Sequence, residues 1–483
     1  MFARRAQALS TSEPALAAVA AAGTLLICVL ASSKLGVDCV LAPLGAVVVY
    51  ILLRRPVAMT ALVVGLAILC EGASFGLFTF TSTLYTSVYK NLTPLDGLVV
   101  LTIISIGWDV SRSRREPRLP RVLVLPAIFL ALGMVAGAVS GSGSGESIKF
   151  VVLSENQLLY LLLLPLAVAN LDIDRRKIKL LLGGAFVLAI VKAVLGIAEV
   201  TSGHGVSIEG SATLTYYEPA ANWVIMVGVL VIFAAIVARV RPPLWMLLGS
   251  PLLVASLLLS YRRSFWIAAV LGLMLVFLLG TSSIGRRMLV PTALLVAGAI
   301  LLLGSVNFQS QLPIVKRATS LSPTDLQSNI EDRYRLDERA NVLAEIKRHP
   351  ISGLGVAVPW KATVRTLSTE HEEGRQYVHF AALYFWLKLG ILGLLAYIGM
   401  ITASMVLAWR AWRLSREPLL RAFALASLCG VAGLVVIDTT ASFTGVDPRF
   451  TVIFAAQVGM LAQIARTARA QPEDMIDAAP APV

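Results

Sequence analysis

The run PAANWVIMVGVLVIFAAIVA at residues 219–238 contains no charged side chain. An α-helix rises about 1.5 Å per residue, so a run of this length can cross the ~30 Å hydrocarbon layer of a bilayer. Other apolar runs of about 17–22 residues recur along nearly the whole chain. The sequence therefore predicts a chain built mainly of membrane-spanning helices.

The composition supports the same class. The chain has 483 residues, of which 57% are hydrophobic and only 14% are charged, and its mean hydropathy is +0.80. Soluble domains carry about 25% charged residues, so an ordinary soluble globular protein is excluded. A membrane β-barrel would show segments of about 10 residues with alternating polarity, and no such alternation is present. We therefore expect an all-α integral membrane protein.

Hydropathy predicts about fourteen spans, and the basic residues predict their orientation. Basic clusters such as Arg54-Arg55 and Arg175-Arg176-Lys177 occupy every second loop, whereas the alternate loops carry Gly, Ser, Thr and acidic residues. Basic loops face the cytoplasm, which places both termini there and explains the net charge of +13 without nucleic acid. The predicted spans run roughly over 15–32, 37–53, 57–78, 94–110, 122–139, 153–170, 178–200, 219–238, 244–260, 265–280, 288–305, 384–408, 419–438 and 449–466.

Five regions follow from these spans. A cytoplasmic N-terminal segment covers 1–14, transmembrane helices 1–11 cover 15–305, and a long external loop covers 306–378. Transmembrane helices 12–14 cover 379–467, and an Ala/Pro-rich, disordered cytoplasmic tail covers 468–483. The external loop is far longer than the other connections, and loops of that length are usually functional or disordered.

The external loop contains a predicted amphipathic helix at 332–348, with Asp332 at its start and Pro350 after its end. At about 100° per residue its apolar face comprises Leu336, Ala340, Leu343 and Ile346. Arg339 projects into this inward sector, whereas the opposite, charged face comprises Glu338, Glu345 and Arg335. An inward arginine needs an anionic partner, either a substrate or an internal carboxylate.

Arg262 and Arg263 lie in a short external turn between two spans. This is the side on which positive charge is disfavoured, so the pair needs an explanation. A guanidinium is a planar fork that matches phosphate oxygens in a bidentate way, which suggests an anionic substrate. The alternative is contact with lipid headgroups or snorkelling to the interface.

Two further polar side chains lie on the predicted external side. His379 lies just before the twelfth span. Glu218 begins the eighth span on the external side, where a carboxylate can also be merely interfacial. No His/Cys/Asp/Glu spacing resembles a metal site, so we expect no tightly held metal and no cofactor.

Three stretches of the chain carry spaced motif residues: YRRSFW at 261–266, ERANVLAEIKRHPISGLGV at 338–356 and HFAALYFWLKLGILGLL at 379–395. Together they resemble the O-antigen ligase and O-antigen polymerase superfamily. The segment HFAALYFWLKLGILGLL at 379–395 has the family spacing of a His followed by two glycines, here Gly390 and Gly393. Residue Phe380 departs from the Asn, Ser or Gln that the family carries after the His.

The segment ERANVLAEIKRHPISGLGV at 338–356 resembles the family's Arg-containing helix followed by a His-Pro and Gly-x-Gly turn. The segment YRRSFW at 261–266 resembles the external arginine that precedes a span, and TLTYYEPAANW at 213–223 is a looser match to an Asn-Pro-Asn segment. The resemblance covers about residues 200–405.

The resemblance implies a GT-C-like helical bundle whose site faces the outside of the bacterial cytoplasmic membrane. It implies a glycosyltransferase that uses a polyprenyl-diphosphate-linked glycan, most simply undecaprenyl diphosphate, and a glycan or lipid acceptor. Arg262, Arg263 and Arg339 would stabilise the leaving diphosphate in place of a metal. His379 would orient or deprotonate the acceptor hydroxyl, with Glu218 as a second candidate base.

Three functions remain open at this point. A polymerase that joins repeat units of a surface polysaccharide is favoured by Phe380 and by the number of spans. A ligase would move the glycan to a lipid or another acceptor. A transporter or flippase of lipid-linked glycans would predict inverted repeats and ionisable residues at mid-membrane, and neither is evident. Other polysaccharide-assembly proteins are further candidate partners.

Overall fold

The computed structural model describes most of the predicted helical regions of the chain. The described residues are 47–71, 79–88, 92–147, 151, 156–204, 206–207, 214–215, 219–280, 330–367 and 376–469. The predicted spans 15–32 and 288–305, most of 37–53, the first part of the external loop and the C-terminal tail lie outside them.

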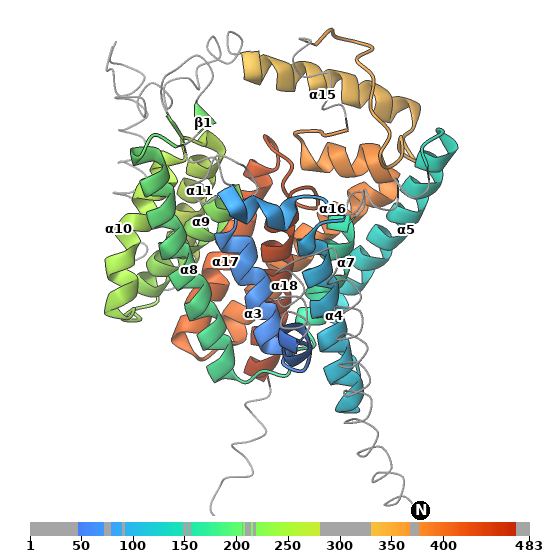
Figure 1. Ribbon diagram of the computed structural model, residues 1–483. Helices are drawn as coiled ribbons and strands as arrows, with labels where there is room; N and C mark the ends of the chain where they lie inside the picture. The colour runs from blue at the N-terminus through green and yellow to red at the C-terminus, as the bar shows by residue number, and fades with distance from the viewer. Residues whose placement is uncertain are drawn as a thin grey trace, which may run out of the picture.

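The described residues form a bundle of apolar helices with one polar helix, α15 (Ile330–Arg348), lying across its end (Figure 1). Two two-residue strands, β1 (Val206–Ser207) and β2 (Leu214–Thr215), pair antiparallel, and the 3-10 helix η1 covers Thr79–Tyr85. The all-α membrane class is thus confirmed. The bundle helices are α3 (Pro56–Leu69), α4 (Pro94–Arg112), α5 (Arg121–Gly143), α7 (Asn156–Val168), α8 (Arg175–Thr201), α9 (Pro219–Val237), α10 (Leu244–Leu259), α11 (Arg263–Leu279), α16 (Ala381–Leu414), α17 (Pro418–Ile437) and α18 (Pro448–Arg469).

Fewer helices than expected are long enough to cross a bilayer. Among the described residues 7 helices have the length and apolarity of a span, or up to 8 if the bent pair Val47–Leu53 and Pro56–Leu69 counts as one. Three apolar helices, α7, α10 and α11, are shorter, with 13, 16 and 17 residues. At about 1.5 Å per residue they are shorter than ~30 Å, so their lengths do not confirm them as full membrane crossings.

The third predicted span, 57–78, also ends early. Helix α3 stops at Leu69, and the backbone of Cys70 is extended. The next residue, Glu71, is buried and pairs with Lys192 of α8. A charge within the bundle is costly unless it is paired, and here the pairing coincides with the end of the helix.

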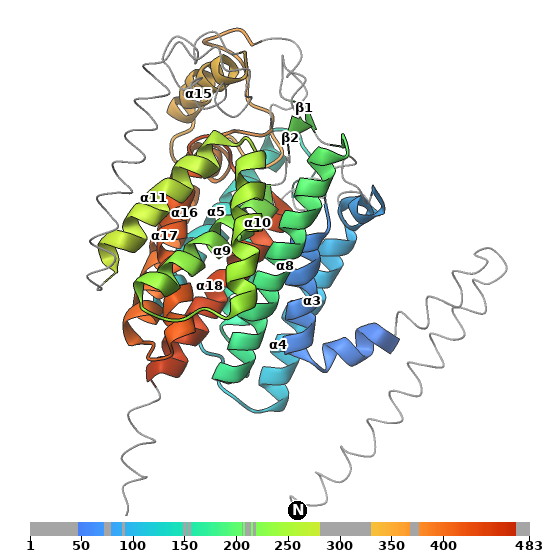
Figure 2. The same ribbon diagram turned by 90° about the vertical axis from the view of Figure 1, so that its left-hand side faces the viewer.

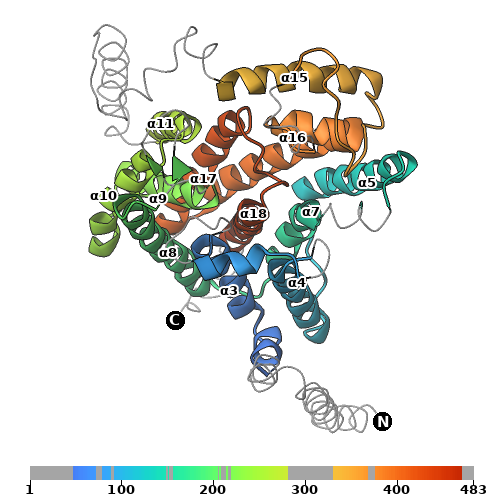
Figure 3. The same cartoon turned by 45° about the horizontal axis from the view of Figure 1, so that its top comes forward.

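Helices α9, α17 and α18 have most of their apolar residues buried, whereas α5 and α8 have about a third or fewer buried. Helix α9 lies between α11 and α8 in Figure 2. Helix α16 packs along α5, α11 packs on α17, and α18 packs on α7. Viewed with the end that carries α15 turned forward, the bundle has α15 above the first turns of α16 (Figure 3). The architecture therefore brings the ends of α11, α16, α17 and α18 beneath one polar helix.

Helix α16 contains a kink at Gly390, where φ is 68° and ψ is −162°. The backbone of the Gly-x-Gly turn docks there, because Leu354 N–H donates to Leu387 O and Ile391 N–H donates to Ile351 O at 3.1 Å. A Cβ at Gly353 would lie 2.5 Å from the backbone nitrogen of Gly390. These motif glycines thus allow two backbones to touch and fix the direction in which α16 begins.

Helix α15 docks by a different face from the one that the sequence analysis predicted. Leu336 is 50% exposed and Arg339 is exposed, whereas Glu338 and Glu345 of the supposed outer face are buried. Ile346, by contrast, is buried as predicted. The periodicity rule failed because this helix docks through specific polar contacts as well as through apolar burial.

Those polar contacts are visible between α15 and the chain that follows it. Asn341 donates to the carbonyl oxygen of Arg365 at 2.8 Å and accepts from the backbone N–H groups of Val364 and Arg365. Asp337 pairs with the Arg365 side chain at 2.9 Å. A small apolar cluster completes the docking, made of Val342, Ile346, Trp360, Val378 and Leu387.

Candidate functional site

His379 lies directly against Glu338 on the inner face of α15. The carboxylate accepts the backbone N–H of His379 at 3.0 Å, and its Oε2 lies 3.0 Å from Nδ1 of the imidazole. Glu338 is only 1% exposed, whereas His379 keeps 24% of its side chain exposed. The carboxylate is therefore buried behind the ring, and the ring itself reaches solvent.

This contact fixes the tautomer of the imidazole. A carboxylate accepts hydrogen bonds and does not donate them, so Nδ1 carries the proton. The lone pair then resides on Nε2, which is the atom that can accept a proton from a bound hydroxyl. The same arrangement of carboxylate, imidazole and reacting hydroxyl operates in the serine hydrolases.

Two aromatic rings restrict how the imidazole can turn. The Tyr377 ring meets the His379 ring edge-on at a centroid distance of 4.8 Å, and the Tyr334 ring does so at 6.0 Å. Tyr334 comes from the first turns of α15, and Tyr377 precedes α16. Residues from two separate segments therefore hold His379 in place.

The segment before α16 is tied to neighbouring chain on both sides. Gln376 donates to Ala357 O, and Trp360 donates to Tyr377 O, each at 3.0 Å. From the loop between α17 and α18, the Ser442 hydroxyl donates to Val378 O at 2.5 Å. These bonds leave little freedom to the backbone that carries His379.

Arg263 begins α11 and reaches the first turn of α15. Its Nη2 lies 2.7 Å from Asp332 Oδ2, and Arg335 Nη1 lies 3.4 Å from Asp332 Oδ1. Two guanidinium groups thus meet at one carboxylate. The site contains Arg335 as well as Arg263, although the sequence analysis placed Arg335 on the outer face.

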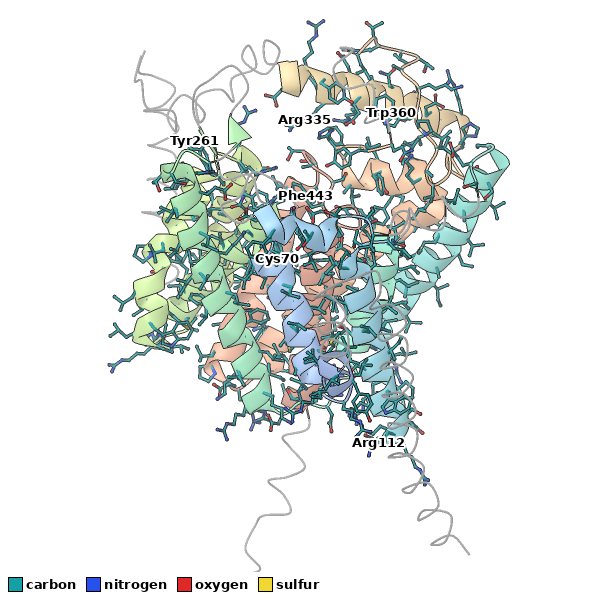
Figure 4. The ribbon with its side chains drawn as sticks, viewed as in Figure 1. Cys70, Arg112, Tyr261, Arg335, Trp360 and Phe443 are labelled. Carbon is teal, nitrogen blue, oxygen red and sulfur yellow. The ribbon has the colours of Figure 1, made fainter. Side chains whose placement is uncertain are left out.

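Arg262 lies one residue earlier and contacts an aromatic ring. Its guanidinium carbon is 5.6 Å from the centroid of the Phe443 ring, in the loop between α17 and α18. Phe443 lies at the end of the bundle that carries α15, below Arg335 of that helix (Figure 4). The ring attracts the cation electrostatically and helps to hold it in orientation.

Arg339 is exposed but lies next to His379 in space. Its guanidinium carbon is 5.4 Å from the centroid of the Phe380 ring, and Phe380 directly follows His379. Within the described part of the chain Arg339 makes no ion pair with a carboxylate. Phe380, which stands where the resembled family has a polar residue, is therefore the residue whose ring contacts Arg339.

Helix α15 contacts both Arg263 and the imidazole of His379. Asp332, which holds Arg263, and Glu338, which holds His379, are six residues apart, or about 9 Å along the helix axis. Arg262 and Arg339 flank these two contacts. Four arginines and one oriented histidine thus gather where α15 lies over the first turns of α11 and α16.

Not every candidate residue can be placed. Glu218 lies outside the described residues, so its position relative to His379 is not defined. Among the described residues, no three His, Cys, Asp or Glu side chains gather as a metal site would require.

The sequence analysis did not identify Glu338 and Asp332 as site residues, although their positions in the chain could have suggested it. Glu338 stands beside Arg339 in the family-like motif, and Asp332 begins the predicted helix. Tyr377 and Phe443 had no signal, because an aromatic residue near a membrane surface is ordinary.

An apolar cavity of about 380 Å³ lies within the bundle between α3, α8, α9 and α18. Trp223 lines it and meets Phe450 at a centroid distance of 5.5 Å, and Phe450 meets Phe443 at 5.7 Å. Contacts between aromatic rings therefore connect the cavity to Arg262. Its other lining residues include Val64, Ile68, Ala185, Val227, Ile453 and Met460.

Comparison with known proteins adds one finding. Residues 248–398 match the model of the family described as O-Antigen ligase. The matched segment runs from α10 into α16 and contains Arg262, Arg263, Arg339 and His379. No curated protein matches the chain.

Proposed function

The chain is a membrane protein that carries a domain of the O-antigen ligase and polymerase superfamily, and we propose that it joins polyprenyl-diphosphate-linked glycans on the outer face of the bacterial cytoplasmic membrane. The observation that supports this most is His379, which a buried carboxylate orients, with Arg339 over the adjacent Phe380 ring and Arg263 bound to the same helix α15. A general base beside cationic groups is what transfer from a diphosphate donor requires.

In the proposed reaction the acceptor hydroxyl binds at Nε2 of His379. The imidazole takes the hydroxyl proton as the acceptor oxygen attacks the anomeric carbon of the donor sugar. The bond between that carbon and the diphosphate oxygen breaks, and the electron pair leaves with the diphosphate. Glu338 stabilises the imidazolium that forms, because its carboxylate already accepts the Nδ1 proton.

The arginines act on the leaving group. Arg262, Arg263 and Arg339 are the proposed diphosphate ligands, and Arg335 joins them through Asp332. Guanidinium groups bind phosphate oxygens in a bidentate way and need no metal ion, so we propose a metal-independent transferase. Activity in excess chelator supports this proposal, and loss of activity that Mg²⁺ or Mn²⁺ restores contradicts it.

The lipid tail of the donor belongs in the bundle. The cavity between α3, α8, α9 and α18 supports this part of the proposal, since apolar side chains form almost all of its lining. An undecaprenyl chain would leave its diphosphate at the outer ends of these helices, where the arginines lie.

The proposed topology follows the positive-inside pattern. Both termini are cytoplasmic, residues 306–378 are external, and the chain crosses the membrane about fourteen times in a GT-C-like bundle. Reporter fusions at residue 325 and after Arg469 test the orientation. External activity of a reporter after Arg469 would overturn both the topology and the proposed location of the reaction.

We favour a polymerase over a ligase because Phe380 occupies the position at which the family pattern carries a polar residue. Its ring supports Arg339 instead of offering a hydrogen bond to an acceptor. Polymerisation requires another lipid-linked chain as acceptor, and ligation requires a different lipid or surface molecule.

The deciding experiment uses purified protein in nanodiscs with a synthetic polyprenyl-diphosphate-linked repeat unit. A ladder of lengthened lipid-linked glycans supports the polymerase, and transfer that occurs only to an added lipid acceptor supports the ligase. Movement of the donor between leaflets without any product would instead support a flippase. The His379→Gln protein is the matched control and should form no product.

A further inference from the structure

We infer that the loop between α17 and α18, residues 438–447, is a positioning element that sets His379 relative to Arg262, with Ser442 and Phe443 as its positioning residues. This loop lies beyond the segment that matches the family. The kinetic part of the inference rests on the proposed function, whereas the structural part does not.

The loop contacts the two residues that precede His379. The Tyr377 hydroxyl donates to Ser442 O at 3.3 Å and accepts the Ser442 N–H at 3.1 Å. The Ser442 hydroxyl donates to Val378 O at 2.5 Å. Three hydrogen bonds therefore join one loop residue to the two residues that precede His379, and the ring of one of them abuts the imidazole.

The next loop residue, Phe443, contacts Arg262 and two neighbouring aromatic rings. Its ring lies under the Arg262 guanidinium and contacts Phe265 of α11 at 6.1 Å and Phe450 of α18 at 5.7 Å. Ser442 thus contacts the segment that carries His379, and the adjacent Phe443 contacts Arg262. A shift of this loop would move the imidazole and the guanidinium together, and a shift of either one alone would break loop contacts.

Asp438 anchors the loop to the bundle. Its backbone carbonyl accepts the N–H of Ala381, the first residue of α16. Its carboxylate accepts the hydroxyls of Tyr397 at 2.9 Å and of Thr444 at 3.0 Å. The loop is therefore fixed at its base and cannot follow His379 passively.

The test compares two substitutions on the histidine side. Tyr377→Phe keeps the ring against His379 and removes the bonds to Ser442, while Ser442→Ala removes the bond to Val378 O. Each should lower kcat, by up to about 10²-fold if the imidazole moves by an ångström, and leave the donor KM unchanged. Thr439→Ala is the control, because this exposed loop residue bonds only to Val436 O among the described residues.

The substitution on the arginine side should have the opposite kinetic effect. Phe443→Leu removes the aromatic face under Arg262 and should raise the donor KM more than it lowers kcat. Phe443→Tyr retains the face and should restore the wild-type KM. A loop with a merely structural role would lower kcat and raise KM together in all these variants, in proportion to lost stability.

A second readout needs no enzyme activity. Diethyl pyrocarbonate modifies histidine, and mass spectrometry can follow His379 separately from the three other histidines. Tyr377→Phe and Ser442→Ala should increase the modification rate of His379 several-fold, and Thr439→Ala should not change it. Wild-type rates in both variants, in folded protein, would overturn the inference. If the wild-type protein transfers no glycan but its modification rates shift as stated, the proposed function fails and the positioning role stands.

Discussion

Glu338 accepts both the backbone N–H and the Nδ1–H of His379, with its Oε2 at 3.0 Å from each nitrogen. The two residues come from different elements, the polar helix α15 and the segment that leads into α16. This contact joins the docking of α15 to the orientation of the imidazole, so a substitution that loosens one also disturbs the other.

Glu338→Gln should lower glycan transfer by about 10²-fold, because an amide stabilises an imidazolium poorly and can donate as well as accept. His379→Gln should remove the base and reduce the rate at least as much. Initial rates at saturating donor measure both effects. Arg333→Ala, on the exposed side of the same helix, is the matched control and should retain full activity. Equal rates for Glu338→Gln and wild type would disprove the role of the carboxylate.

Arg263→Ala should cost about 10²–10³-fold in transfer rate, which is the usual effect of removing one charge-stabilising donor. Arg263→Lys should rescue poorly, since an ammonium lacks the bidentate fork. Asp332→Asn separates two explanations. If Arg263 serves only to dock α15, both variants should detach the helix, as limited proteolysis between α11 and α15 would show. If it binds diphosphate, Asp332→Asn should keep substantial activity while Arg263→Ala does not.

Arg339→Ala should weaken donor binding, because the Arg339 guanidinium lies over the ring of Phe380, the residue that follows His379. Phe380→Leu should reproduce part of this loss, whereas Phe380→Tyr should not. Binding of a fluorescent polyprenyl diphosphate to detergent-solubilised protein measures the effect directly. Lys347→Ala, an exposed cation on the last turn of α15, is the control for net charge. A loss of affinity equal to that of Lys347→Ala would mean that Arg339 contributes only general charge.

Asp438 predicts a pH dependence of stability. Burial raises the pKa of this carboxyl from 3.8 to about 7, just beyond the end of α17. The folded state then holds a proton that the unfolded state releases, so stability falls as pH rises from about 4 to about 7. The unfolding temperature in detergent should therefore be higher at pH 5 than at pH 8. Asp438→Asn should reduce this difference, and an unchanged difference would show that other groups cause it.

The sequence by itself determined the membrane class and the positions of the apolar helices, and it named Arg262, Arg263, Arg339 and His379 as candidate site residues. Apolar runs locate helices because the bilayer forces backbone groups to bond within the segment. The spacing of His379 from Gly390 and Gly393 pointed to the family whose model matches residues 248–398. A Cβ at Gly390 would collide with the backbone of Ile351, so this position requires glycine. Such constraints act locally along the chain and can therefore be read from it.

Only the tertiary structure decided which face of α15 is buried and what each charge contacts. The periodicity of the helix favoured Leu336 and Arg339, but Glu338 is buried because a histidine distant in sequence satisfies its carboxylate. In the same way Arg263 contacts Asp332, and Arg262 contacts Phe443, which lies 181 residues later in the chain. A buried polar group is stable only with its partner, and no pattern in the sequence names that partner before the helices pack.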